Sequence, residues 1–257
     1  MNSLQVDRIL FISDLHLSSS RPEITALFLS FLKNRAREAA ALYILGDLFD
    51  FWVGDDDPTP PRHHVSSGIK QLVETGTDVF IMQGNRDFLL SENFANECGG
   101  KIINDCQVID CGGIPTLLMH GDLLCTDDLP YQTFRELSRT RQWQENALGK
   151  PLWLRLGLVR WYRMKSYFHK RKQAIEIMDV ADKTVWQYCR QYNVSRLIHG
   201  HTHRPGYHNM GNSEQILQRY VLGDWGESAR ILALDSSGIR FETISLNTSG
   251  EFNCQVM

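Results

Sequence analysis

A junction between an apolar run and a polar cluster occurs five times in this chain and sets narrow limits on its fold. Each apolar run has the length of a strand, and each cluster is built from Asp, Asn or His. The clusters are SDLH at 13–16, GDLFD at 46–50, GNRD at 84–87, HGD at 120–122 and GHTH at 200–203. Ligand sites in open α/β sheets form beyond the carboxyl ends of the strands. We therefore expect the five clusters to converge on one shared site.

Strands and helices alternate along the first half of the chain, which favours a βαβ arrangement. We expect strands at 8–14, 42–47, 78–85 and 196–203, and a hairpin over 101–122. We expect helices at 22–40, 65–75, 90–98 and 174–192. Residues 219–246 alternate like an antiparallel meander, and 247–257 have the look of a loose tail. The pattern predicts an α/β fold with a single domain over residues 1–257.

Residues 129–173 interrupt this alternation. Between 131 and 175 the chain carries eleven Lys or Arg and only two Glu, a charge of +9, although the whole chain carries −3. Three of the six tryptophans, at 143, 153 and 161, lie there as well. We expect helices at 131–147 and 152–164, and interpret 129–173 as a helical insertion that caps the α/β core.

The composition of this cap fits an acylated, anionic substrate at a membrane surface, because Trp, Tyr and Leu beside Arg and Lys suit the interface. An ordinary solvated cap with a tryptophan core is the plainer alternative. A nucleic-acid surface is a third, since basic and aromatic residues interleave. We do not expect nucleic acid as a partner, because the segment is compact rather than a long stripe.

The composition excludes several classes of protein. With 42% apolar and 22% charged residues, the chain is neither disordered, collagen-like nor a coiled coil. No apolar run approaches 18 residues, and the run at 9–12 is too short for a signal-peptide core. We therefore expect a cytoplasmic protein whose six cysteines are free thiols.

Side chains with metal-ligand chemistry gather in the polar clusters. Imidazole, carboxylate and amide ligands together suit Mn, Fe or Zn. Seven ligands are too many for one tetrahedral ion and suit two, with Asp47 as a bridge; such pairs clamp both oxygens of a phosphoryl displacement. The candidates are Asp14, His16, Asp47, Asn85, His120, His201 and His203.

Each candidate alone has a structural explanation. Asp47 could cap a helix, Asn85 could form a turn, and His120 could be a core histidine with its bonds satisfied. Their joint occurrence after five apolar runs makes a metal site the better hypothesis.

The clusters resemble the signature of the calcineurin-like metallophosphoesterase family, D-x-H, G-D-x-x-D, G-N-[HR]-[DE], H and G-H-x-H. Every element is present between residues 9 and 205. The resemblance implies a sandwich of two central β sheets flanked by helices, with a dinuclear metal centre at one edge. It also implies hydrolysis of a phosphate ester or anhydride.

Arg86 points to a particular subgroup of the family. Most members have His after the motif asparagine, and related nucleases would also have His at this position. The runs LYILGDLFDFWVGDDDP, GNRDFLL, MHGDLLCTDD and LIHGHTHRP are similar to those of the UDP-2,3-diacylglucosamine hydrolases of lipid A biosynthesis. Those pyrophosphatases release UMP and 2,3-diacylglucosamine 1-phosphate (lipid X). The resemblance implies two manganese ions per chain, UDP-2,3-diacylglucosamine as the substrate, and a peripheral location on the cytoplasmic face of the inner membrane.

The resemblance also assigns roles to individual residues. One ion would take Asp14, His16, Asp47 and His203, and the other Asp47, Asn85, His120 and His201. Substrate contacts are implied at Asn85, Arg86, Asp128, Ser166 and His201. The family's Asn and Lys in the insertion are absent; Lys170 and Gln173 stand near those places, and Lys172 would serve with a one-residue shift.

Arg86 would neutralise charge on the phosphoryl oxygens, since an arginine cannot act as an acid. A phosphate leaving group needs little protonation, which fits pyrophosphate cleavage. We expect Asp50 and Asp87 to orient ligand imidazoles. The acidic run GDDD at 54–57 is interpreted as a turn with no ligand role.

Two other functions remain open on the sequence. One is a phosphodiesterase or phosphatase of the same fold with a different anionic substrate. The other is a scaffold without catalysis, which the retention of all seven ligands argues against.

Overall fold

The computed structural model describes residues 8–170, 180–211 and 216–256, without the side chains of 162–170. The strands are β1 (Ile9–Ile12), β2 (Ala41–Leu45), β3 (Asp78–Met82), β4 (Lys101–Ile103), β5 (Cys106–Asp110), β6 (Pro115–Met119), β7 (Arg196–His199), β8 (Gly206–Asn209), β9 (Gln218–Val221), β10 (Ser228–Asp235), β11 (Gly238–Leu246) and β12 (Phe252–Val256). The helices are α1 (Pro22–Lys33), η1 (Arg35–Glu38), α2 (Arg62–Glu74), α3 (Glu92–Cys98), η2 (Asp122–Leu124), α4 (Leu129–Ser138), α5 (Arg141–Leu148), α6 (Leu152–Lys170) and α7 (Asp182–Gln191). Within these ranges no helix combines the length and apolar character needed to span a bilayer.

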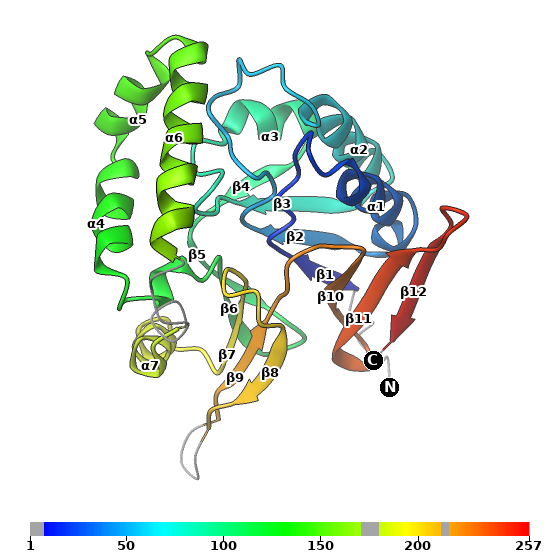
Figure 1. The fold of residues 1–257 in the computed structure, drawn as a ribbon. Helices are drawn as coiled ribbons and strands as arrows, with labels where there is room; N and C mark the ends of the chain where they lie inside the picture. The colour runs from blue at the N-terminus through cyan, green and yellow to red at the C-terminus, as the bar shows by residue number, and fades with distance from the viewer. Residues whose placement is uncertain (1–7, 171–179, 212–215, 257) are drawn as a thin grey trace.

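The strands form two mixed sheets (Figure 1). The larger sheet has the order β12-β11-β10-β1-β2-β3-β4, and the smaller one β5-β6-β7-β9-β8. Strands β1 to β4 are parallel to one another, as are β6, β7 and β9. Parallel strands bring their carboxyl ends to one edge, which is where the polar clusters follow. Two sheets flanked by helices confirm the expected fold class.

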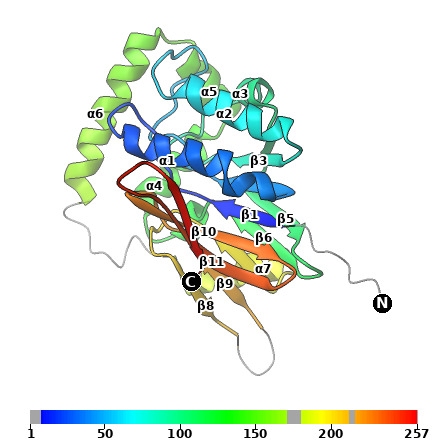
Figure 2. The same ribbon diagram turned by 90° about the vertical axis from the view of Figure 1, so that its right-hand side faces the viewer.

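Apolar side chains hold the layers together. Phe11 of β1 and Leu118 of β6 belong to the core between the two sheets. Phe28 of α1 lies in the core between the larger sheet and helices α1 to α3, which cover its outer face (Figure 2). Val185 of α7 packs on the smaller sheet. Burial on both faces explains why the central strands read as continuous apolar runs.

The expected helical insertion forms three helices rather than two. The predicted helix over 131–147 is wrong, because α4 ends at Ser138 and α5 starts at Arg141. Thr140 has extended backbone, and its hydroxyl accepts a bond from the Trp143 amide, so it caps a new helix. Helices α4, α5 and α6 lie together beside the sheets (Figure 1). We call them the cap.

The end of the chain also differs from the prediction. Residues 252–256 form β12, which pairs with β11 at the edge of the larger sheet, so the tail is not loose. Phe252 and Cys254 pack against the core of that sheet. The expected meander over 219–246 is wrong at its start, because β9 pairs with β7 and β8 in the smaller sheet.

Candidate metal centre

The backbone takes an unusual conformation where the polar clusters begin. Five of the seven candidate ligands have positive φ, between 51° and 70°. This left-handed region costs a non-glycine residue about 1 kcal/mol or more, so it persists only where the surroundings enforce it. The five are Asp14, His16, Asp47, His201 and His203. Backbone strain therefore concentrates on the residues that the sequence selects for metal binding.

Glycines in the motifs make room for the carboxylates. A Cβ at Gly84 would lie 2.1 Å from an oxygen of Asp47, and one at Gly200 would lie 2.3 Å from an oxygen of Asp14. No real Cβ approaches an oxygen so closely. The glycines of the GNRD and GHTH clusters are thus required by the position of the two aspartates.

An unbroken series of side-chain contacts joins all seven candidates. His203 lies 3.4 Å from Asp14 and 3.3 Å from His16. Nδ1 of His16 is 3.7 Å from Asp47, whose other oxygen is 3.8 Å from Nε2 of His120. Oδ1 of Asn85 then lies 2.9 Å from His120 and 2.9 Å from His201. Five chain segments meet here, as the strand-end argument predicts.

The donors fit divalent metal ions. Two groups have ligand atoms within 4.8 Å of one another: Asp14, His16 and His203, and Asp14, Asp47 and His120. Oδ1 of Asp14 and Nδ1 of His16 are buried and have no hydrogen-bond partner among the described residues. A buried polar atom without a partner is costly, and a cation between these atoms would satisfy it.

Burial and charge set the protonation of the centre. Burial raises the pKa of Asp47 to about 7 and lowers the pKa of His16 to about 3. Burial opposes charge on His203 as well, but Asp14 and Asp224 outweigh it and raise the pKa of His203 to about 9. Near neutral pH these shifts favour protons on Asp47 and His203, which bound cations would displace.

Two imidazoles of the centre are held by groups that the sequence argument does not name. Nδ1 of His120 donates to the Leu45 carbonyl at 2.8 Å, which leaves Nε2 facing the centre. Nδ1 of His203 lies 3.5 Å from Asp224. The expectation for Asp87 is wrong, because its carboxylate accepts backbone N–H groups of three residues, Asp47, Phe49 and Gly84. It fixes the loops rather than a ring.

Asp224 was missed by the sequence argument although a signal for it exists. The run YVLGD at 220–224 is a sixth apolar run followed by a polar cluster, in this case Gly-Asp, and it begins within β9. Tyr131 of the cap was missed as well. Its ring stacks on His201 with centroids 6.3 Å apart, and its hydroxyl donates to Asp122. No local pattern indicates that a cap residue reaches a ligand.

Arg86 lies at the rim of the centre. Its backbone N–H donates to Asp47 at 2.9 Å, and its guanidinium binds Asp50 at 2.8 Å and lies 3.6 Å from Asp47. About a third of its side chain is exposed. The guanidinium is thus held next to the centre and still reaches solvent.

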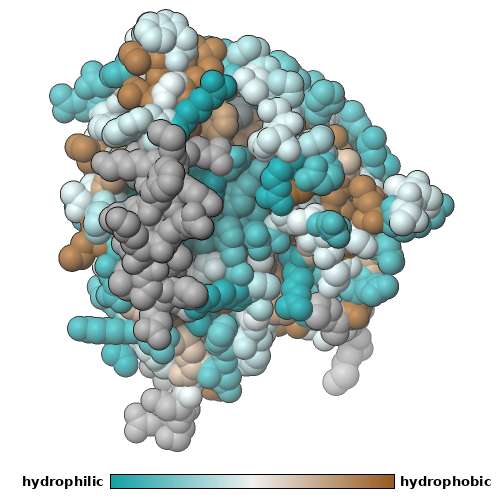
Figure 3. Space-filling model, viewed as in Figure 1, coloured by the Kyte–Doolittle hydropathy of each residue, from teal (hydrophilic) through white to brown (hydrophobic). Residues whose placement is uncertain are grey.

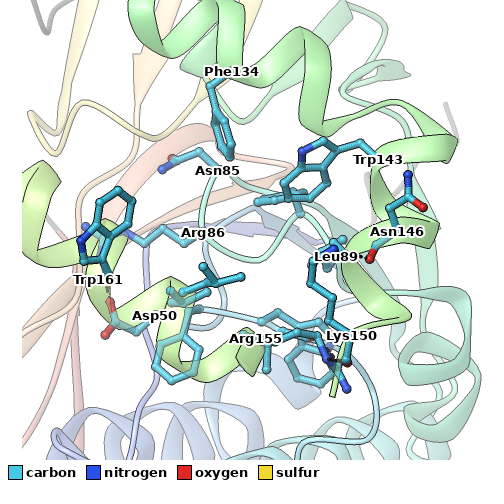
Figure 4. Close-up of a pocket in the computed structure, with 17 residues that line it drawn as sticks. Asp50, Asn85, Arg86, Leu89, Phe134, Trp143, Asn146, Lys150, Arg155 and Trp161 are labelled. Atoms are coloured by element: carbon cyan, nitrogen blue, oxygen red, sulfur yellow. Dashed lines mark hydrogen bonds and ion pairs between the residues drawn. The ribbon is translucent and has the colours of Figure 1, made fainter. Parts of the chain in front are cut away.

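A cavity of about 700 Å³ opens beside Arg86, between the core loops and the cap. Figure 4 shows Arg86, Asp50 and Trp161 toward one side of the cavity, with Phe134 above them and Trp143 toward the other side. Phe134 and Trp143 meet edge to face, with ring centroids 6.0 Å apart. The cavity thus joins a charged end at the metal centre to apolar walls.

The remaining predicted substrate residues have different outcomes. Asp128 is the N-cap of α4 and accepts a bond from the Tyr131 amide; it does not line the cavity. Ser166 and Lys170 lie in the part of α6, residues 162–170, whose side chains are not described. Lys172 and Gln173 lie outside the described residues.

Known proteins resemble this chain in sequence. A sequence profile of the calcineurin-like phosphoesterases matches residues 7–205. A UDP-2,3-diacylglucosamine hydrolase of Stenotrophomonas maltophilia is 44% identical over 92% of this chain and 98% of its own. One of Actinobacillus succinogenes is 46% identical over 90% of this chain and 97% of its own. Among solved structures, Vacuolar Protein Sorting 29 from Cryptosporidium parvum aligns over 98% of this chain and 97% of its own, with 14% identity and a TM-score of 0.48.

Proposed function

This chain belongs to the calcineurin-like phosphoesterase family, and from that premise we propose that it hydrolyses the pyrophosphate bond of UDP-2,3-diacylglucosamine. The products would be UMP and 2,3-diacylglucosamine 1-phosphate. The observation that carries the proposal is the cavity, which joins the seven-ligand centre to apolar walls. The substrate has a pyrophosphate, which matches the charged end of the cavity, and two acyl chains, which match its apolar walls.

The metal centre is proposed to hold two manganese ions. Asp14, His16, Asp47 and His203 would bind one, and Asp47, Asn85, His120 and His201 the other. When bound, such a pair lowers the pKa of water toward neutrality and neutralises phosphoryl charge. The contacts of Asp47 with His16 and His120 support its role as the shared ligand.

Arg86 is proposed to bind the phosphoryl oxygens as negative charge grows on them. Asp50 holds the guanidinium at 2.8 Å, so little conformational entropy is lost when substrate arrives. Arginine keeps its proton at any working pH, so the leaving group departs as a phosphate without a general acid. Asn85 and His201, which contact each other, would fix the substrate beside it.

The cap is proposed to be an insertion over residues 129–173 within one domain, and to hold the acyl chains in the cavity. Trp161 and Leu158 of α6 line it and remain about half exposed. Their partial exposure suits a cavity that admits chains from outside. Burying apolar chain there is worth about 0.8 kcal/mol per CH₂ group.

The outer side of the cap is proposed to rest on the cytoplasmic face of the inner membrane. Hydrophobic residues gather over the cap, at the upper left of Figure 3. Leu148 of α5 and Trp153 of α6 are exposed apolar side chains of the cap. Not all basic residues there are available for lipid headgroups. Arg135, Arg139 and Arg155 bind the core through Asp122, the Gly84 carbonyl and Asp56.

The test is product analysis by mass spectrometry after UDP-2,3-diacylglucosamine and Mn²⁺ are added to the purified protein, with a chelator control. UMP and 2,3-diacylglucosamine 1-phosphate, both lost with the chelator, are expected. No such products, with hydrolysis of bis(4-nitrophenyl) phosphate intact, would favour another anionic substrate on the same centre. A protein that takes up no Mn, Fe or Zn would contradict the metal centre itself.

A further inference from the structure

The cavity has two separate walls, and its width depends on how they are held together. One wall comes from core residues such as Trp52 and Val53, and the other from cap residues such as Trp143 and Leu158. Trp52 and Val53 of the first wall are followed in the chain by the acidic GDDD run at 54–57, for which the sequence predicts only a turn. This run, here called the GDDD loop, therefore lies where core and cap must be joined.

Arg155 of α6 makes that join. Its guanidinium donates to the Val53 carbonyl and to both oxygens of Asp56, through Nη1 at 2.8 Å and through Nη2. Its Nε donates to the Lys150 carbonyl at 2.8 Å, where α6 is about to begin. Only 7% of the Arg155 side chain is exposed. A two-oxygen arginine–carboxylate contact fixes direction as well as distance.

Gly54 makes the space that the guanidinium occupies. Its φ is +139°, and a Cβ there would lie 2.3 Å from Nη1 of Arg155 and 2.8 Å from Asp56. Any other residue would push the guanidinium out of place. The glycine that opens the GDDD run is thus explained by the contact with the cap.

The GDDD loop is itself attached to the core. Nε1 of Trp52 donates to Asp55 at 3.1 Å, and the other oxygen of Asp55 accepts a bond from Ser91, the N-cap of α3. Arg62 of α2 lies over the Trp52 ring at 5.3 Å. The GDDD loop is therefore held in place by contacts with α2 and α3, so Arg155 binds a fixed part of the core.

We propose that Arg155 and the GDDD loop form a clasp that positions helix α6 against the core and so sets the cavity for a substrate with long apolar chains. Arg155 and Asp56 are positioning residues in this proposal, and neither contacts a candidate metal ligand in the described side chains. The effect on substrate rests on the proposed function, whereas the join between α6 and the loop does not.

The experiment compares Asp56→Ala, Arg155→Met and the double variant with wild type in the full chain. We expect each single variant to raise KM for UDP-2,3-diacylglucosamine by about tenfold, which corresponds to about 1.4 kcal/mol. The double variant should be no worse than Arg155→Met, because Arg155→Met already removes the contact with Asp56 together with the bonds to the Val53 and Lys150 carbonyls. Asp56→Ala should leave hydrolysis of bis(4-nitrophenyl) phosphate, which has no acyl chains, within about twofold of wild type.

Arg141→Met is the matched control. It removes the same charge from the same cap, but Arg141 is 91% exposed and pairs with Glu145 of its own helix at 2.7 Å. It should leave KM unchanged. An unchanged KM in Asp56→Ala, or an equal loss on the acyl-free diester, would overturn the clasp as a determinant of specificity.

Hydrogen exchange separates this proposal from the proposed function. Amides at 50–57 and 152–159 should exchange faster in Asp56→Ala and Arg155→Met than in wild type or Arg141→Met. If wild type cleaves the acyl-free diester but not UDP-2,3-diacylglucosamine, the proposed function fails. The hydrogen-exchange result then still tests whether Arg155 and the GDDD loop hold α6 against the core. Unchanged exchange in both segments would overturn the clasp.

Discussion

At the scale of single residues, Asp47 is a buried carboxylate whose protonation depends on a bound cation. It is 1% exposed, and burial raises its pKa to about 7. Asp47→Ala should lower kcat/KM by more than about a hundredfold, because changes even to groups behind a ligand cost tenfold to a hundredfold. The metal content, measured by elemental analysis, should fall together with kcat/KM. The midpoint of thermal unfolding should be the same for the metal-free variant as for metal-free wild type.

The control for this variant is Asp78→Ala. Asp78 begins β3, at the edge of the sheet away from the centre, and pairs with Lys101 at 3.0 Å with 61% of its side chain exposed. It should leave both metal content and kcat/KM unchanged. Full activity in Asp47→Ala would disprove the shared-ligand role.

Arg86 gives a prediction about leaving groups. Arg86→His should lower kcat on the pyrophosphate substrate by about a hundredfold, the usual cost of losing one donor to a developing anion. It should lose much less on diesters with alkoxide leaving groups, because histidine can supply the proton that arginine keeps. The ratio of the two rates, measured also for Arg86→Lys, checks this. Equal losses on both substrates would contradict the proposed role.

Residues that the motifs contain were predictable, and those that act across the fold were not. Asn85 and His201 lie in different clusters, yet both were selected because each follows an apolar run. Tyr131 was not, because its contact with His201 depends on how α4 docks. Asp87 was found but misassigned, since a carboxylate that binds backbone N–H groups looks the same in sequence as one that orients a ring.

At the scale of elements, a buried ion pair joins η1 to β11. Arg35 and Glu242 are 8% and 1% exposed, and Nε and Nη2 of Arg35 donate to the two carboxylate oxygens at 2.7 Å. Glu242→Gln should lower the free energy of unfolding by about 3 kcal/mol, because the buried guanidinium loses its buried partner and keeps Glu38, bound at 2.8 Å and 60% exposed. The double variant Arg35→Met, Glu242→Met should recover most of that loss. Urea unfolding at neutral pH measures both.

The same pair predicts a dependence on acid. Burial opposes the charge of Glu242, but Arg35 outweighs it and holds the pKa of Glu242 below its ordinary value of 4.5. A lowered folded pKa means that the contribution is complete above about 4.5 and is lost as the pH falls through the folded value. Wild type should therefore lose stability faster than the double Met variant below that pH. Parallel losses would show that the pair does not titrate as inferred.

Elements were predicted where one local signal decides them. The strands before the polar clusters are apolar on both faces, so their type was plain. The break at Thr140 was missed because residues on both sides favour helix and only the cap geometry separates them. Strand β12 was missed because its ladder with β11 depends on a turn at 247–251, and short polar strands carry little signal of their own.

At the scale of the whole molecule, the two-sheet arrangement came from the family resemblance and not from the periodicity. Residues 9–11 pair with 232–234, and 196–199 pair with 218–221 in the other sheet. Periodicity indicates that a segment is a strand but not which strand lies beside it. The angle of the cap is equally nonlocal, because it depends on the contacts of Arg139 and Arg155 with the core loops.

Two tryptophans of α6 separate binding of the membrane from binding of the substrate. Trp153 is 74% exposed and does not line the cavity, whereas Trp161 is 55% exposed and does. Trp153→Ser should reduce partitioning onto anionic lipid vesicles by about tenfold, since an interfacial tryptophan is worth at least about 1.4 kcal/mol, and should leave kcat on detergent-dispersed substrate unchanged.

Trp161→Ser should do the opposite and raise KM for the dispersed substrate more than it weakens vesicle binding. Co-sedimentation with vesicles at low and high salt measures vesicle binding, and steady-state kinetics in detergent measure KM. Added salt should release the wild-type protein from anionic vesicles, because salt screens the attraction between anionic lipid and the net positive charge of residues 131–175. If both variants affect vesicle binding and KM equally, the cap has one apolar surface rather than an outer face for the membrane and an inner face for the substrate.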